Sequence, residues 1–142
     1  MLDVHIDEFW NDCAAILLTG IRSFPRPQTL FIEDICGPDS VDEFGLHSAR
    51  HLAALGAVQW VQDEGFIRFS TLNRQESVDD FVLTGKSFRR LLTIANPDSL
   101  KRGADQLQQA DSTPVFQVLE FARLQGNSGW CGELLQHYLL QP

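Results

Sequence analysis

The stretch HSARHLAALGAVQWVQDEGFIRFS, from His47 to Ser70, decides the fold of this chain. Its apolar residues predict one long helix that begins near Leu46 or His47. Gly65 should end the helix, because glycine readily adopts the left-handed conformation that closes helices. The segment GFIRFS after this glycine reads as a strand, in which Phe66 and Arg68 alternate with Ile67 and Phe69, so that both faces have some apolar content. The stretch therefore predicts a helix that leads directly into a small sheet.

The middle of this helix is apolar on almost every side. Between Leu52 and Val61, Gln59 is the single strongly polar side chain. A helix that is apolar all round is normally covered all round. We therefore expect Leu52, Leu55, Trp60 and Val61 to pack against more than the neighbouring hairpin.

The residues that follow predict a hairpin and then a second amphipathic helix. The segments GFIRFS and DDFVLT read as two strands, joined by a loop with Asn73, Arg74, Gln75 and Glu76 at its tip. From Lys86 to Ile94 the spacing predicts a helix. Its expected apolar face consists of Phe88, Leu91 and Leu92, and its expected exposed face of Lys86, Arg89 and Arg90.

Another amphipathic helix is predicted upstream, from about Val4 to Ile21. The segment SFPRPQ should end it, because each proline removes a backbone donor and restricts the residue before it. TLFIEDIC can form either a single helical turn or a short strand, and the sequence leaves both open. PDSVDEFG is a polar, acidic connection.

The last third of the chain also predicts helices. Ser99 is a candidate cap for one of them, and Thr113 a candidate cap for another with Pro114 at its first position. Gly126 and Gly129 should separate that helix from a final one. We expect residues 113–142 to cover the apolar surface of the preceding part, either within the chain or across a homodimer.

This order of elements resembles the winged-helix domain of the helix-turn-helix class. The resemblance covers about residues 4–95, and its best-matched pieces are DEGFIRF at the start of the wing and FVLTGKSFRRLL at its return. It implies a mainly α fold with a small β-hairpin wing, followed by a C-terminal helical extension over about 96–142. The sequence is also similar to small uncharacterised bacterial proteins of this build, from which no activity can be transferred.

Length and composition limit the kinds of protein that this chain can be. With 142 residues, 44% of them hydrophobic, the chain predicts a single globular domain over 1–142. Its first residues, MLDVHIDEFWNDC, are acidic where a secretory signal is basic, and no apolar run is long enough to span a bilayer. We therefore expect a cytoplasmic protein without a membrane partner.

The charge is unevenly distributed. The net charge is −8. Residues 1–46 carry two arginines against nine acids, whereas residues 47–102 carry eight Lys and Arg against six acids. An acidic protein is poorly attracted to a polyanion over long range. DNA binding is thus disfavoured, although the basic residues gather around the long helix and hairpin.

One set of side chains is a candidate surface for a partner or for nucleic acid: Ser48, Arg50, His51, Arg68, Arg74, Arg89 and Arg90. In a winged helix that reads DNA, the first turns of the long helix contact bases. Arg74, at the wing tip, would then contact phosphate. The alternative is an ordinary solvated surface, because acids are interspersed among these arginines. From this pattern we expect protein contacts or homodimer formation, in a regulatory or adaptor role, with DNA-binding transcriptional regulation as the alternative.

No catalytic, metal or cofactor site is evident in the sequence. His47 and His51 stand four residues apart and could reach one ion, yet the glutamate of an HExxH motif and any further ligand are missing. The three cysteines are widely spaced among apolar residues, which indicates reduced, mostly buried thiols. The sequence therefore predicts a protein that is not an enzyme.

Overall fold

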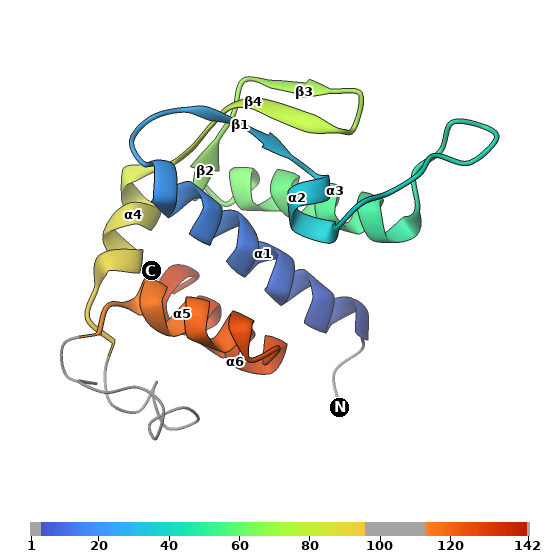
Figure 1. Cartoon of the computed structure of the whole chain (residues 1–142). Helices are drawn as coiled ribbons and strands as arrows, with labels where there is room; N and C mark the ends of the chain where they lie inside the picture. Colours follow the sequence, from blue (N-terminus) through green and yellow to red (C-terminus); the bar gives the residue numbers. More distant parts are fainter. Residues whose placement is uncertain (1–3, 96–112, 142) are drawn as a thin grey trace.

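The computed structural model describes residues 4–95 and 113–141, and it is mainly helical with a small antiparallel sheet (Figure 1). Ser99 lies outside the described residues. In chain order the elements are α1 (Val4–Ser23), β1 (Gln28–Phe31), α2 (Glu33–Cys36), α3 (Ala49–Asp63), β2 (Ile67–Arg68), β3 (Thr71–Asn73), β4 (Ser77–Leu83), α4 (Gly85–Leu92), α5 (Val115–Leu124), α6 (Ser128–Leu134) and the π-helical turn η3 (Leu135–Leu139). Within the described part of the chain, no helix has the length and apolar character needed to cross a bilayer.

Helix α1 runs through the centre of the fold. It begins as its apolar stripe predicts and continues two residues past Ile21, to Ser23, before the prolines end it. Every residue from Cys13 to Leu18 is buried. The TLFIEDIC segment forms both of the structures that its sequence left open, because strand β1 passes directly into the single turn α2.

Helix α3 begins later than the apolar pattern predicts. Ser48 is its N-cap, and the Ser48 hydroxyl accepts a hydrogen bond from the backbone N–H of His51 at 3.2 Å. Leu46 and His47 therefore precede the helix, because a serine cap satisfies the first free N–H groups better than either residue could. After the helix, Gly65 has φ +83°, as expected for a closing glycine.

Helix α3 is less completely buried by its neighbours than its apolar composition predicts. Leu55 and Val61 are buried and Trp60 is half-buried, but the side chain of Leu52 is 42% exposed. Leu52 lies on the same side of α3 as Gly56 and Gln59, which are also exposed. One face of the helix is thus open to solvent, and the expectation for Leu52 was wrong.

Strand β4 is the centre of the sheet. It pairs antiparallel with β1 on one side, where Leu30 lies opposite Val78, and with β2 and β3 on the other. The hairpin is longer than predicted, because β3 and the first residues of β4 form within the segment that the sequence assigned to the loop. Arg74 and Gln75, with φ of +51° and +63°, make the turn at its tip.

The C-terminal helices cover the apolar surface within the chain. Helices α5 and α6 both pack against α1, and α4 packs against α5 and η3. Val118, Leu119, Trp130 and Leu134 are buried in the same core cluster as residues of α1 and α3. Residues 113–141 therefore find their apolar partners within the chain, and no second copy is needed to cover them.

Four local expectations for α4, α5 and α6 were wrong. Pro114, not Thr113, is the N-cap of α5, because the backbone of Thr113 and Pro114 pairs with the chain that leaves α4. Gly129 lies inside α6 and does not separate helices. On α4, Leu92 is exposed, whereas Arg90 is half-buried and donates a hydrogen bond to the Leu139 carbonyl.

Two helical glycines provide a matched test of this packing. A Cβ added at Gly132 would lie 2.8 Å from Cδ1 of Trp10, whereas one at Gly56 would meet open space. We expect Gly132→Ala to lower the free energy of unfolding by about 1–3 kcal/mol, because the indole must move. Gly56→Ala should raise it by about 0.5–1 kcal/mol through helix propensity. Urea unfolding of the two variants measures both, and equal effects would contradict the packing of α6 on α1.

Candidate functional site

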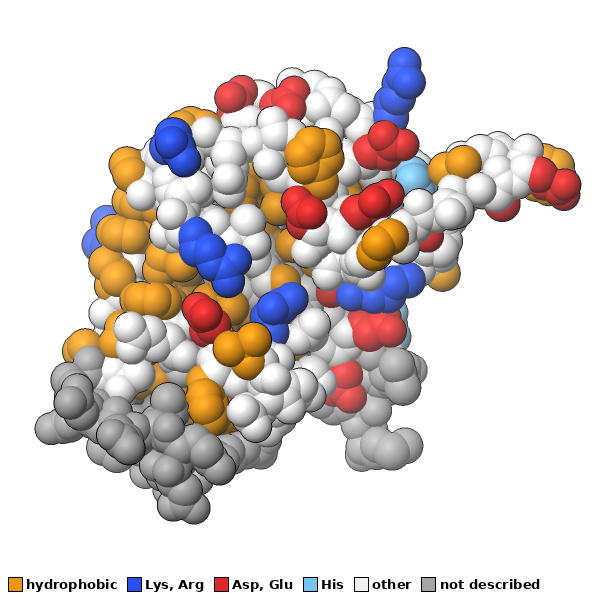
Figure 2. All heavy atoms as spheres, viewed as in Figure 1, with side chains coloured by type: hydrophobic (Ala, Val, Ile, Leu, Met, Phe, Trp, Pro, Cys, Tyr) orange, Lys and Arg blue, Asp and Glu red, His pale blue; other side chains and the backbone are white. Residues whose placement is uncertain are grey.

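The basic residues predicted to form a contact surface lie on separate elements. Arg68 is on β2, Arg74 is at the turn between β3 and β4, and Arg89 and Arg90 are on α4. On the face drawn in Figure 2, Lys and Arg side chains form separate patches with acidic and apolar side chains between them. Among the described residues, that face therefore carries no continuous basic surface.

Arg50, the one arginine of α3, is held by acids of α1. Its Nη1 and Nη2 donate to the two carboxylate oxygens of Asp12 at 2.8 and 2.5 Å. Its Nε lies 4.0 Å from Oε2 of Glu8. Asp12 is fully buried. A bidentate pair of this kind holds the guanidinium in one geometry, so Arg50 would have to leave a buried partner before it could contact DNA.

The ionisation of this pair follows from its burial. Burial raises the pKa of Asp12 above its ordinary value, while the hydrogen bond and charge of Arg50 act to lower it. The hydrogen bond to Asp12 in turn raises the pKa of Arg50. Arg50 thus provides the charged partner that the buried carboxylate of Asp12 requires, which is a structural role.

A crevice of about 460 Å³ opens beside this ion pair, between α1 and the turn from α5 to α6. Asp7, Glu8, Arg50 and Arg123 contribute charged side chains to its lining. The lining therefore carries charges of both signs. This lining favours neither an anionic nor a cationic ligand.

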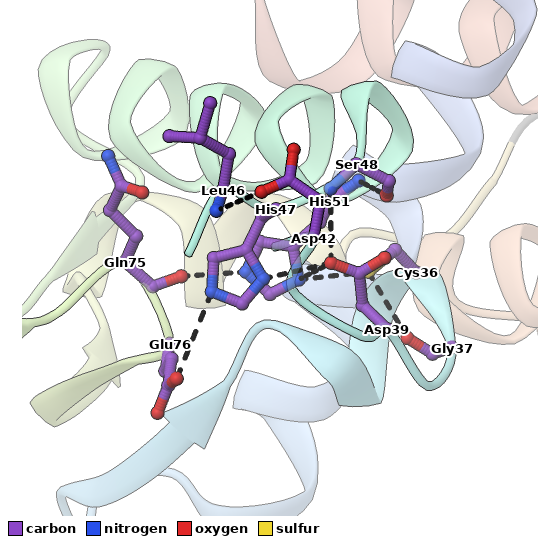
Figure 3. A network of polar contacts seen from close by, with 10 residues as sticks. All are labelled: Cys36, Gly37, Asp39, Asp42, Leu46, His47, Ser48, His51, Gln75 and Glu76. Atoms are coloured by element: carbon purple, nitrogen blue, oxygen red, sulfur yellow. Dashed lines mark hydrogen bonds and ion pairs between the residues drawn. The ribbon is translucent and has the colours of Figure 1, made fainter. Parts of the chain in front are cut away.

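His51 and its neighbours form the second polar cluster, between α2, the start of α3 and the hairpin turn (Figure 3). The rings of His47 and His51 stack, with centroids 3.8 Å apart and planes inclined by 7°. Oδ2 of Asp39 lies 2.8 Å from Nδ1 of His47 and 3.7 Å from Nδ1 of His51. Sγ of Cys36 lies 3.9 Å from the same nitrogen of His51. His47 precedes α3, yet the two rings still meet.

The tautomer of His51 is set by the hairpin turn. Its Nε2 lies 2.7 Å from the backbone carbonyl of Gln75, which can only accept, so Nε2 carries the proton. In the neutral ring, Nδ1 then presents a lone pair toward Asp39 and Cys36. Because His51 is fully buried, it cannot serve as a surface contact in this conformation.

Asp39 also anchors a projecting segment, residues 38–48, which we call the arm. Oδ2 of Asp39 accepts hydrogen bonds from Nδ1 of His47 and, at 3.2 Å, from the backbone N–H of Ser48. Hydrogen bonds from Ser48 and His47 lower the pKa of Asp39 to about 2. At the far end, Oδ1 of Asp42 accepts from the backbone N–H groups of Phe44 and Leu46, each at 2.9 Å. Side-chain hydrogen bonds therefore fix the arm both at its base, through Asp39, and at its tip, through Asp42.

Asp39, Cys36 and Asp12 are the residues that sequence reasoning missed. Asp39 and Cys36 lie eight or more positions before His47, in the acidic connection and the preceding short element. The apolar stripe of the helix predicted over 4–21 places Asp12 on its outer, polar face, yet the structure buries this side chain. A buried acid and its half-buried arginine can be paired only when their helices are known to meet, and no local sequence pattern shows that.

The buried ion pair makes a testable prediction. Arg50→Met should lower the free energy of unfolding by about 2–3 kcal/mol at pH 7, because Asp12 loses its partner while remaining buried. An acid whose pKa is raised in the folded state destabilises that state only above its unfolded pKa. The loss should therefore shrink as the pH falls toward 3.8, the ordinary value for Asp12.

A double-mutant cycle isolates the interaction. In an Asp12→Asn background, Arg50→Met should cost less than about 1 kcal/mol, because no buried charge is left unpaired. Urea unfolding of the four proteins at several pH values gives the coupling energy. Equal losses in both backgrounds would show that Arg50 stabilises the fold through packing alone.

The chain was also compared with known proteins. No protein-family model, no curated protein and no solved structure matches it. Function is therefore inferred from the residues and their geometry.

Proposed function

We propose that this protein is a winged-helix protein that works through protein contacts, including contact between two copies of itself, in a regulatory or adaptor role. Support for the winged-helix assignment comes from the order of elements: helix, strand, short helix, long helix and hairpin. The pairing of β1 with β4 adds the first strand to the hairpin, as in that architecture. The C-terminal helices are an addition that covers α1.

The observation that carries the proposal is the solvent face of α3. Its exposed residues are Ala49, Leu52, Gly56, Gln59 and Asp63. Small, apolar, neutral and acidic side chains make up this face, and the arginine of the helix is bound to Asp12. A recognition helix presents basic or amide groups to bases and phosphates. A face with exposed Ala, Gly and Leu instead suits close approach of another protein surface.

The arm adds a second apolar element next to this face. Figure 1 shows it extending away from the helices and the sheet, just before α3 begins. Val41, Phe44 and Leu46 are 50%, 77% and 61% exposed. Large apolar side chains gathered on one projecting segment mark an interaction site more often than single scattered ones do. Their burial on contact would contribute roughly 1.5–3 kcal/mol for each fully covered side chain.

DNA binding is the alternative function. Arg74 favours it, since the residue is exposed at the tip of the hairpin, where a wing contacts phosphate. Arg68, Lys86 and Arg89 are exposed as well. Against it stand the net charge of −8 and the absence of a cation on the solvent face of α3, all of whose residues are described.

The two functions differ in the sign of their salt dependence. Added salt weakens DNA binding, because counterions released from phosphates return. Added salt should strengthen contact between two copies, because it screens repulsion between two acidic chains. We expect little affinity for duplex DNA at physiological salt and a mass above the monomer that rises with protein and salt concentration. Light scattering and a salt-titrated DNA-binding assay measure these, and sub-micromolar DNA affinity that falls with salt would reverse the ranking.

Variants on the proposed surface test its location. Phe44→Ser and Gly56→Glu should each reduce the mass average at high protein concentration, since one removes an apolar contact and the other places a charge on the face. Leu124→Ser is the matched control, because Leu124 is 71% exposed but lies on α5. Its mass average should equal that of the wild type. If the control variant dissociates as readily as the other two, the contact does not use the arm and α3.

A further inference from the structure

We propose that Asp39, His47, His51 and Cys36 bind one zinc ion at the base of the arm. Asp39, His47 and His51 each offer a ligand atom, and these atoms lie within 4.8 Å of one another. Among the described residues this is the one such group of three or more His, Cys, Asp and Glu side chains.

The spacing of the donor atoms suits a tetrahedral ion. With zinc–ligand distances near 2.0–2.1 Å, two nitrogen or oxygen ligands lie roughly 3.3 Å apart. The observed separations from Oδ2 of Asp39, 2.8 Å to His47 and 3.7 Å to His51, lie on either side of that value. The two rings stack with planes inclined by only 7°, so one ion cannot lie in both ring planes until a ring rotates. His47 is the ring that must turn, because the Gln75 carbonyl holds His51.

The hydrogen bonds orient the histidines for this role. The carbonyl of Gln75 accepts from Nε2–H of His51, which leaves the Nδ1 lone pair 3.7 Å from a carboxylate oxygen. Ligating histidines commonly donate their second N–H to a carbonyl or a carboxylate. His47 has such a group nearby, since its Nε2 is 3.8 Å from Oε1 of Glu76.

Cys36 would supply the fourth ligand. It lies outside the group whose ligand atoms are all within 4.8 Å of one another, so its Sγ must also move closer to Asp39 and His47. Its Sγ lies 3.9 Å from Nδ1 of His51 and 3.4 Å from the Gly37 carbonyl, so the thiol must turn from that carbonyl toward the ion. On binding, the thiol gives its proton to solvent, and the His47 proton moves from Nδ1 to Nε2 through exchange with solvent. Four protein ligands around a low-exposure centre make a closed, structural site. The side chains of Asp39, His47 and His51 are 11%, 6% and 0% exposed.

Such an ion would join α2, both ends of the arm and the start of α3. Cys36 ends α2, Asp39 lies at one end of the arm, and His47 lies at the other. His51 is in the first turn of α3. The hairpin turn would support the site from outside through the Gln75 carbonyl. Because the ion would link several elements, metal binding should stabilise the folded chain.

The test uses the full chain with any affinity tag removed and bound metal stripped by a chelator. Titration calorimetry should show one equivalent of Zn²⁺ bound with a dissociation constant below roughly 1 µM. At a free zinc concentration about 100 times that constant, the melting temperature should rise by roughly 5–10 °C. Cobalt as a substitute should give tetrahedral d–d bands with a thiolate charge-transfer band. No zinc binding at roughly 100 µM, or binding with no thermal shift, would overturn the proposal.

Variants assign the ligands. Asp39→Asn and His47→Gln should each lower zinc affinity by more than the roughly 10–100-fold that loss of an outer partner costs. Glu76→Gln, which changes a residue beside His47 and not a ligand, should lower zinc affinity by a factor within that range. Cys36→Ser should abolish the thiolate band of the cobalt protein. His137→Gln is the control, an exposed histidine on η3.

Folding of the metal-free variants is checked separately. Circular dichroism and thermal melting without metal should match the metal-free wild type, so that loss of binding reflects loss of a ligand. Should Asp39→Asn unfold the arm, His47→Gln and the cobalt spectrum of Cys36→Ser still decide the assignment. Wild-type affinity in either of those two variants, or a loss of affinity in His137→Gln, would refute the proposed ligand set.

Discussion

The burial of α1 is the constraint on which the rest of this structure depends. Six consecutive residues, from Cys13 to Leu18, are buried. Because an α-helix turns once in 3.6 residues, a buried run of this length points in every direction and needs neighbours on every side. Helix α3 and strand β4 cover α1 on one part of its surface, and α5 and α6 cover the remainder. The C-terminal helices are thus part of the same core.

The same constraint determines what α3 can do. Asp12 is next to this buried run, and a buried carboxylate requires a charged partner. Arg50 meets that need from the first turn of α3, so the helix is tied to α1 by its one basic side chain. What α3 shows to solvent is then neutral or acidic.

Much of the architecture could be predicted because it depends on local chemistry. The stripe of α1, the glycine that closes α3 and the tip of the hairpin are set by periodicity and turn preferences within a few residues. Exposure was harder to predict. Leu52 was expected inside and lies outside, because burial depends on which elements arrive from elsewhere in the chain. The candidate site was less predictable still, since Asp39 and His51 come from different segments.

By itself, the sequence determined most of the helices, the hairpin, their order and the mainly helical class of the fold with its small sheet. Spacing and turn chemistry act over short distances, so one chain segment suffices to specify them. Only the tertiary structure decided that Arg50 would bind Asp12 and that the C-terminal helices would close over α1 within the same chain. It alone also brought Cys36 and Asp39 to the two histidines. These pairings join residues that are distant in sequence, and a charge or a lone pair is satisfied only where folding places its partner.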